Sequence, residues 1–267
     1  MKKSSYIILI SGYAFLYIPI IFLIVFSFNN SIFPGIWTGF SLKWYKELFS
    51  NYIIWNAVKI SIKIAAMSAT GAVILGTLGA MALTKLKNFK NTSFFQIITS
   101  APLIMPDIIL GISLLLMFVI CERLFGIPSK RGMVTIAIAH ITLAMAYVLL
   151  IVQSRLADFE HSLEEAALDL GARYFQTICH VTIPIIFPAI ISSWLLTFAV
   201  SLDDVVIANF LTGAQATTLP ILIFSNVKTG ITPEINALAT LLISVMSFIT
   251  ITIGFVLYKK SYTAGSS

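Results

Sequence analysis

Acidic residues inside long apolar stretches are the residues of this sequence best suited to chemistry. Asp203 and Asp204 are adjacent within the segment 201–206, and Asp107 follows Pro106 in another apolar stretch. A carboxylate at the centre of a bilayer costs about 2.5–3.5 kcal/mol on insertion scales, so each acid is a candidate functional residue. Carboxylates in a passage of low dielectric constant attract cations. The acids therefore predict a cation pathway at membrane depth.

Each acid also has a structural interpretation. Asp203 and Asp204 could bond to Ser, Asn or backbone groups of neighbouring helices. Asp107 could cap a helix that restarts after Pro106, because proline kinks or breaks a helix. Neighbouring residues on a helix lie about 100° apart, so both Asp203 and Asp204 border one pathway only where the helix is unwound. If only one of the two faces the pathway, Asp204 is the weaker candidate.

Three further residues have more than one interpretation. His140, in an apolar stretch, is interpreted mainly as an interhelical hydrogen-bond partner. Glu234 follows Pro233 in an expected outer loop, where it would be exposed and could guide cations inward. Trp44 is either an anchor at the membrane interface or a cation contact. The sequence has no tight cluster of His, Cys and carboxylate residues, so no metal site is predicted.

The composition indicates what positions these residues. The chain has 267 residues, of which 58% are hydrophobic and 10% charged. Soluble domains have roughly 45–50% apolar and about 25% charged residues, and a bilayer-spanning helix needs about 20 mostly apolar residues. We therefore expect an all-α polytopic membrane protein with a single transmembrane domain over 1–267. The six expected spans cover about 6–28, 62–83, 95–121, 133–153, 185–211 and 237–258. The second is rich in Gly and Ala, which favours close helix packing.

The distribution of charge and the motifs in the sequence exclude some classes of function. The basic residues lie near segment ends, where they suit lipid headgroups, and form no stripe with aromatics, which argues against nucleic acid. The basic clusters at 85–90 and 259–260 favour cytoplasmic N- and C-termini. The sequence has no P-loop of the form G-x-x-x-x-G-K-[S/T], so we expect a chain that does not hydrolyse ATP. An autonomous cation channel or ion-coupled transporter remains an alternative, whereas an intramembrane enzyme would need a catalytic set that the spacing does not suggest.

The segment 154–184 is the most informative soluble part of the sequence. Helix-forming residues precede Gly171, which suits a left-handed helix end, and a second helical piece is expected at 172–179. An ordinary amphipathic connector would have a similar pattern. However, the Glu-Ala-Ala triplet at 165–167, Gly171 and the pair Ile183-Pro184 resemble the EAA loop of ABC importer permeases, which usually have Leu before the proline.

That resemblance implies the ABC importer permease (MetI-like) fold, with the loop forming a coupling helix that docks on a cytosolic ATPase. The implied coupling residues are Glu164, Glu165, Ala166, Ala167, Asp169 and Gly171. It also implies the partners: a homologous second permease, a cytosolic ATPase dimer and an extracytoplasmic binding protein. ATP and magnesium would belong to the ATPase, and this chain would carry no cofactor.

Four segments resemble the permeases of spermidine/putrescine importers: 16–21, 106–108, 201–206 and 227–240. This resemblance implies import of polyamines across the bacterial plasma membrane by alternating access. It also implies a substrate pathway through Trp44, Asp107, Ser201, Asp203 and Asp204. Import of another small cation or compound by the same kind of permease is the alternative.

Overall fold

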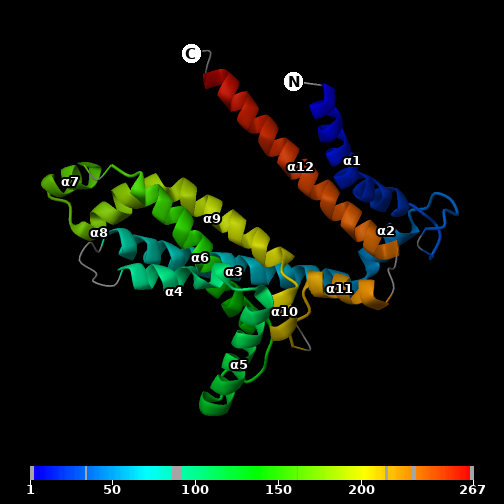
Figure 1. Ribbon diagram of the computed structural model, residues 1–267, viewed down its shortest axis with the longest axis horizontal. Coiled ribbons are helices and arrows are strands. Elements are labelled where there is room, and N and C mark those ends of the chain that lie inside the picture. The colour runs from blue at the N-terminus through cyan, green and yellow to red at the C-terminus, as the bar shows by residue number, and fades with distance from the viewer. Residues whose placement is uncertain are drawn as a thin grey trace. The chain divides into compact units, whose positions relative to one another are not determined.

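The computed structural model describes residues 3–33, 35–85, 92–160, 162–213, 216–229 and 233–264. Every named element in these ranges is helical (Figure 1). They are α1 (Lys3–Phe26), α2 (Lys43–Ser50), α3 (Tyr52–Lys85), α4 (Thr92–Ile104), α5 (Asp107–Phe125), α6 (Met133–Ala157), α7 (Ser162–Asp169), α8 (Tyr174–Thr177), the π-helical turn η1 (Ile178–Thr182), α9 (Ile183–Asp203), α10 (Val206–Leu211), α11 (Leu219–Thr229) and α12 (Pro233–Ala264).

Long apolar helices confirm the prediction of an all-α polytopic membrane protein. Within the described residues, five helical stretches are long and apolar enough to cross a bilayer: Ile8–Phe26, Tyr52–Thr84, Asp107–Phe125, Met133–Ala157 and Tyr174–Asp203. Shorter apolar helices cover Phe94–Ile104, Leu219–Lys228 and Pro233–Phe248. The limits given for the six spans stay predictions, as does the assignment of 1–267 to a single domain.

Two of the six expected spans are each divided between two helices. The third is interrupted where α4 ends at Ile104 and α5 begins at Asp107. Pro106 between them has no N–H to donate, which ends the first helix. The fifth is interrupted where α9 ends at Asp203, because the backbone of Asp204 is extended (φ −68°, ψ 125°) and α10 begins at Val206.

The chain forms two compact units, residues 56–222 and residues 1–55 with 223–267. In the 56–222 unit, α6 packs against α9, α4 and α10. The glycines of α3 lie against α6, as the sequence predicts. A Cβ at Gly76 would stand 2.6 Å from Cβ of Val148, and one at Gly71 would stand 2.6 Å from Cδ1 of Ile141. Only glycine allows the two backbones to approach this closely.

In the other unit, α12 packs against α1 and α2. Trp44, in α2, is buried there and its indole N–H donates to the carbonyl oxygen of Asn29 over 2.7 Å. Asn51 donates to the carboxylate of Glu234 at the start of α12 over 2.9 Å. The expected loop position of Glu234 is therefore the first turn of a helix, where its carboxylate is already hydrogen-bonded.

Candidate functional site

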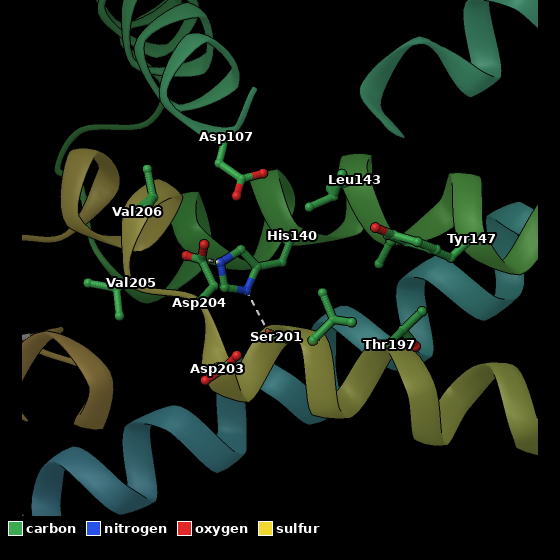
Figure 2. A pocket seen from close by; sticks show the side chains of 12 residues that line it. Asp107, His140, Leu143, Tyr147, Thr197, Ser201, Asp203, Asp204, Val205 and Val206 are labelled. Atoms are coloured by element: carbon green, nitrogen blue, oxygen red, sulfur yellow. Dashed lines mark hydrogen bonds and ion pairs between the residues drawn. The ribbon is translucent and has the colours of Figure 1, made fainter. Parts of the chain in front are cut away.

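A pocket of about 370 Å³ lies beside both helix interruptions of the 56–222 unit (Figure 2). It is lined by Asp107, His140, Leu143, Ala144, Tyr147, Thr197, Val200, Ser201, Asp203, Asp204, Val205 and Val206. The α6 residues recur at i, i+3, i+4 and i+7, so α6 presents one face. Thr197, Val200 and Ser201 likewise share one face of α9, and Asp203 joins them from the last residue of that helix. The acids come from the first turn of α5 and from the junction between α9 and α10.

Asp107 is an exposed carboxylate on the α5 side of this pocket. Its side chain extends from the start of α5 toward the pocket, as Figure 2 shows. Among the described residues it has no hydrogen bond or ion pair, so the capping interpretation has no hydrogen bond to support it. The N-terminus of α5 carries a partial positive charge that stabilises a carboxylate in the first turn. Asp107 therefore has free hydrogen-bonding capacity on the α5 side of the pocket.

Asp203 is the second free carboxylate of the pocket. It is the last residue of α9 and is exposed. No described residue bonds its side chain or forms an ion pair with it. Together with Asp107 it gives the pocket two acids whose oxygens can accept hydrogen bonds from a bound cation.

Asp204 lines the same pocket, but its carboxylate is occupied. Its Oδ2 accepts hydrogen bonds from the backbone N–H of Ala208 over 2.7 Å and from Nε2 of His140 over 3.1 Å. Its Oδ1 accepts the N–H of Ile207 over 3.3 Å. Asp204 thus satisfies N–H groups in the first turn of α10, which have no partners within that helix. The pocket contains both adjacent acids because the helix is interrupted between them, but they have different roles.

His140 joins α6 to both sides of this interruption. Its Nδ1 lies 2.6 Å from Oγ of Ser201 in α9, and its Nε2 contacts Asp204. The residue is 4% exposed. Because a carboxylate oxygen only accepts, the tautomer that fits both contacts has its proton on Nε2, and its Nδ1 accepts a hydrogen bond from the Ser201 hydroxyl. His140 is therefore the interhelical partner that the sequence suggests, and it also lines the pocket.

The hydrogen bonds run from Ser201 through His140 to Asp204, which is the arrangement of side chains in a hydrolytic triad. In such a triad the serine must reach a substrate carbonyl beside an oxyanion site. Here Ser201 is only 8% exposed, and Asp204 caps α10 as well as binding the histidine. The arrangement is that of a structural link between helices.

Trp44 does not lie among the residues that line this pocket, because it belongs to the other compact unit. The ammonium of Lys43 lies 4.9 Å from the centroid of its ring. Its indole N–H and one ring face are thus engaged within its own unit. The role of Trp44 in a substrate pathway stays a prediction.

The expected coupling loop forms α7, a turn and α8. Gly171 has φ +88°, which confirms the left-handed helix end expected there. The second helical piece is α8 followed by the π-helical turn η1, where the sequence suggested one helix over 172–179. Glu165 is exposed, whereas Glu164 accepts a hydrogen bond from the hydroxyl of Thr182 in η1. Ala166, Asp169 and Gly171 are also exposed, and Ala167 is half-buried.

The residue types around the pocket bear on metal binding. Within the described ranges, no three His, Cys, Asp or Glu side chains gather as a metal site would require.

His140 is the pocket residue whose importance the sequence understated. The available signal was an ionisable ring within an apolar span, which is expensive in lipid unless it has partners.

The helical membrane fold, its interrupted helices and the exposed loop define a polytopic transport permease. The family model described as "Binding-protein-dependent transport system inner membrane component" matches residues 72–261, and the chain belongs to that family. Its members are transport subunits rather than enzymes. Membership makes this chain a multi-pass component of an ABC importer.

Curated relatives carry the same assignment over nearly the whole chain. The putrescine transport system permease protein PotI of Escherichia coli K12 is 47% identical over 91% of this chain and 86% of its own. The spermidine/putrescine transport system permease protein PotC of the same strain is 40% identical over 96% and 93%. PotC of Haemophilus influenzae is 39% identical over 93% and 94%.

Solved structures share the fold at low sequence identity. A chain of a bacterial ABC transporter that imports the acidic polysaccharide alginate superimposes with a TM-score of 0.69 at 18% identity, covering 97% of this chain and 98% of its own. The MetNI methionine ABC transporter, in an inward-facing form, gives a TM-score of 0.54 at 15% identity, covering 76% and 92%. These likenesses confirm the expected MetI-like permease fold.

Proposed function

We propose that this chain is a permease subunit of an ATP-driven importer for polyamines, with putrescine and spermidine as the substrates. The names of the PotI and PotC relatives, which cover most of this chain, support that substrate class. The family of binding-protein-dependent components supports the importer class. The chemistry of the pocket supplies an independent reason.

The observation that carries the proposal is a pair of carboxylates in one pocket, Asp107 and Asp203, which have no hydrogen-bond or ion-pair partner among the residues that the structure describes. An ammonium group has three donors and no acceptor, so two carboxyl groups with free lone pairs suit it well. Hydrogen bonds that involve charged groups are stronger than neutral ones. A neutral or anionic solute would gain nothing comparable from these two groups.

The rest of the lining suits the methylene segments between the amines. Leu143, Val200 and Val206 give the pocket apolar walls, and Tyr147 adds an aromatic ring. Burial of methylene groups contributes about 0.8 kcal/mol for each group removed from water. An aromatic face attracts a cation as well. A flexible chain with separated ammonium groups matches both parts of the pocket.

The transport cycle that we propose is alternating access. A homologous permease completes the pathway, a cytosolic ATPase dimer docks on the exposed α7 segment, and an extracytoplasmic binding protein delivers the polyamine. The N- and C-termini then lie in the cytoplasm of the bacterium, on the same side as α7. ATP and magnesium stay with the ATPase, and closure of its dimer moves α7 and opens the permease pair outward. Each ligand shifts the equilibrium only through its different affinity for the two states.

The test is uptake of radiolabelled putrescine by liposomes that contain the two permeases and the ATPase, with binding protein and internal ATP. We expect uptake that needs all components and that unlabelled spermidine inhibits. Butane-1,4-diol has the same carbon chain without charges and serves as the matched control, which should not inhibit. Uptake that this chain performs alone would favour an autonomous channel. No polyamine uptake by the complete system would refute the proposed substrate.

A further inference from the structure

The junction between α9 and α10 is an interrupted stretch of helix that lines the pocket. Asp203 ends α9, and the extended backbone of Asp204 leads into α10 two residues later. The direction of the free Asp203 carboxylate therefore depends on what holds this short junction in place. Neither proline nor glycine occurs between 201 and 206, so the backbone there is not fixed by residue type.

Helix α6 holds α10 at both of its ends. At the N-terminal end, His140 binds the Asp204 carboxylate that caps α10. At the C-terminal end, the hydroxyl of Thr135 donates to the carbonyl oxygen of Leu211 over 3.0 Å. Helix α10 also packs closely on α5, since a Cβ at Gly111 would stand 2.5 Å from the Phe210 ring. The segment after the junction is thus fixed to α5 and α6.

On the other side of the junction, the same imidazole holds the last turn of α9. The Ser201 hydroxyl lies 2.6 Å from Nδ1 of His140, and both residues are buried. One ring therefore links the turn before Asp203 to the residue after it, as the dashed lines in Figure 2 indicate. Asp203 lies between the two attachment points and is the member of this group with a free carboxylate.

We infer that His140 is a positioning residue of the cation site. By binding Ser201 and Asp204 together, it keeps the Asp204 carboxylate engaged and leaves Asp203 directed at the pocket. This inference rests on the proposed function, since it assigns His140 a role in binding the same polyamine. The imidazole acts through Ser201 and Asp204 and does not itself bind the substrate.

Two substitutions at this position separate the two attachments. The amide of glutamine reaches the place of Nε2, so His140→Gln retains a donor for Asp204. The amide of asparagine reaches the place of Nδ1, so His140→Asn retains a partner for Ser201 and loses the bond to Asp204. Thr142→Val is a matched control on α6, because the Thr142 hydroxyl bonds only its own helix, at the Ile138 carbonyl.

Affinity is measured as equilibrium binding of radiolabelled putrescine to the purified permease–ATPase complex. The binding protein is left out, because its own affinity for putrescine would otherwise determine how binding depends on the putrescine concentration. Loss of this bond releases the junction, so putrescine loses its charge-assisted contact with Asp203, which corresponds to about tenfold or more in an equilibrium constant. We expect His140→Asn to raise the Kd about tenfold, and His140→Gln to restore it to within about threefold of the wild type. Thr142→Val should leave the Kd unchanged.

Three outcomes would overturn the inference: a wild-type or lower Kd for His140→Asn, the same loss for both variants, or the same loss for Thr142→Val. If His140→Asn does not assemble, Asp204→Ala removes the same bond from the other side, and a Kd within twofold of the wild type would overturn the inference. Absence of putrescine binding by the wild-type complex would instead count against the proposed function. The two failures are therefore distinguishable.

Discussion

Replacement of Asp203 by asparagine removes one charge from the pocket and little else. The side chain is exposed, and no described residue bonds it. The substitution keeps the size of the group, so the fold should tolerate it, and an exposed change of this kind usually alters stability by less than about 0.5 kcal/mol. Asp203→Asn thus isolates the contribution of the charge to binding.

The expected loss follows from the chemistry of a single contact. A hydrogen bond with a charged partner contributes roughly 1.5–3 kcal/mol. Since Asp203 is open to solvent, the lower half of that range applies. A loss of about 1.5–2 kcal/mol raises the Kd for putrescine roughly 10- to 30-fold. Uptake by the complete system should fall in parallel at limiting substrate.

The assay is putrescine binding to the purified permease–ATPase complex, with thermal stability of the complex as the control for folding. Asp204→Asn is the matched comparison. Asparagine caps a helix about as well as aspartate, so α10 is retained, but the charge-assisted bond to His140 is weakened. We expect this variant to lower the melting temperature more than it changes the Kd. Equal Kd values for Asp203→Asn and the wild type would refute the assignment of Asp203.

Further predictions concern the loop and the packing of α5. Glu165→Lys should abolish uptake and reduce recovery of the ATPase with the complex, because the exposed charge is reversed on α7; unchanged co-purification would exclude a coupling role. Gly171→Ala should impair coupling more than Gly171→Asn, since φ +88° costs a non-glycine residue about 1–2 kcal/mol and asparagine tolerates that angle better. The measurement is the ATPase activity that loaded binding protein stimulates. Equal losses of that activity in the two variants would contradict the prediction. Gly111→Ala should lower the melting temperature, because its Cβ would stand 2.5 Å from Phe210, whereas Gly12→Ala has nothing within 4 Å and serves as control.

Local sequence signals predict the helices and the close packing of α3. Gly71 and Gly76 occupy positions where an added Cβ would collide with α6, as their spacing in an apolar span suggests. Pro106 likewise marks the interruption before α5. These features depend on residues near one another in the chain, so a pattern in one segment is sufficient.

The division of roles between Asp203 and Asp204 could not be derived from the segment that contains them. Both are acids in the same apolar context, and only the extended backbone at Asp204 distinguishes them. That distinction depends on His140, which lies 64 positions earlier and meets Asp204 because α6 packs on α9. The register between two apolar helices is determined by side-chain packing over their whole length, which a single sequence does not reveal.

Trp44 illustrates the opposite case. Its aromatic type suggested a cation contact, but its indole N–H binds Asn29 and Lys43 lies over its ring. Lys43 is the preceding residue, whereas the contact with Asn29 depends on how the chain folds back over fifteen positions. The structure thus gives the partners of Trp44 within its own unit, and its role in a substrate pathway stays a prediction.

The central claim is that a polyamine binds between Asp107 and Asp203. The most direct measurement is a cryo-electron microscopy map of the permease–ATPase complex with putrescine, prepared with an ATPase variant that binds but does not hydrolyse ATP. We expect density for an extended ligand in the pocket, with an ammonium group within hydrogen-bonding distance of at least one of the two carboxylates. A ligand bound elsewhere in the permease, with both carboxylates in contact only with water, would contradict it.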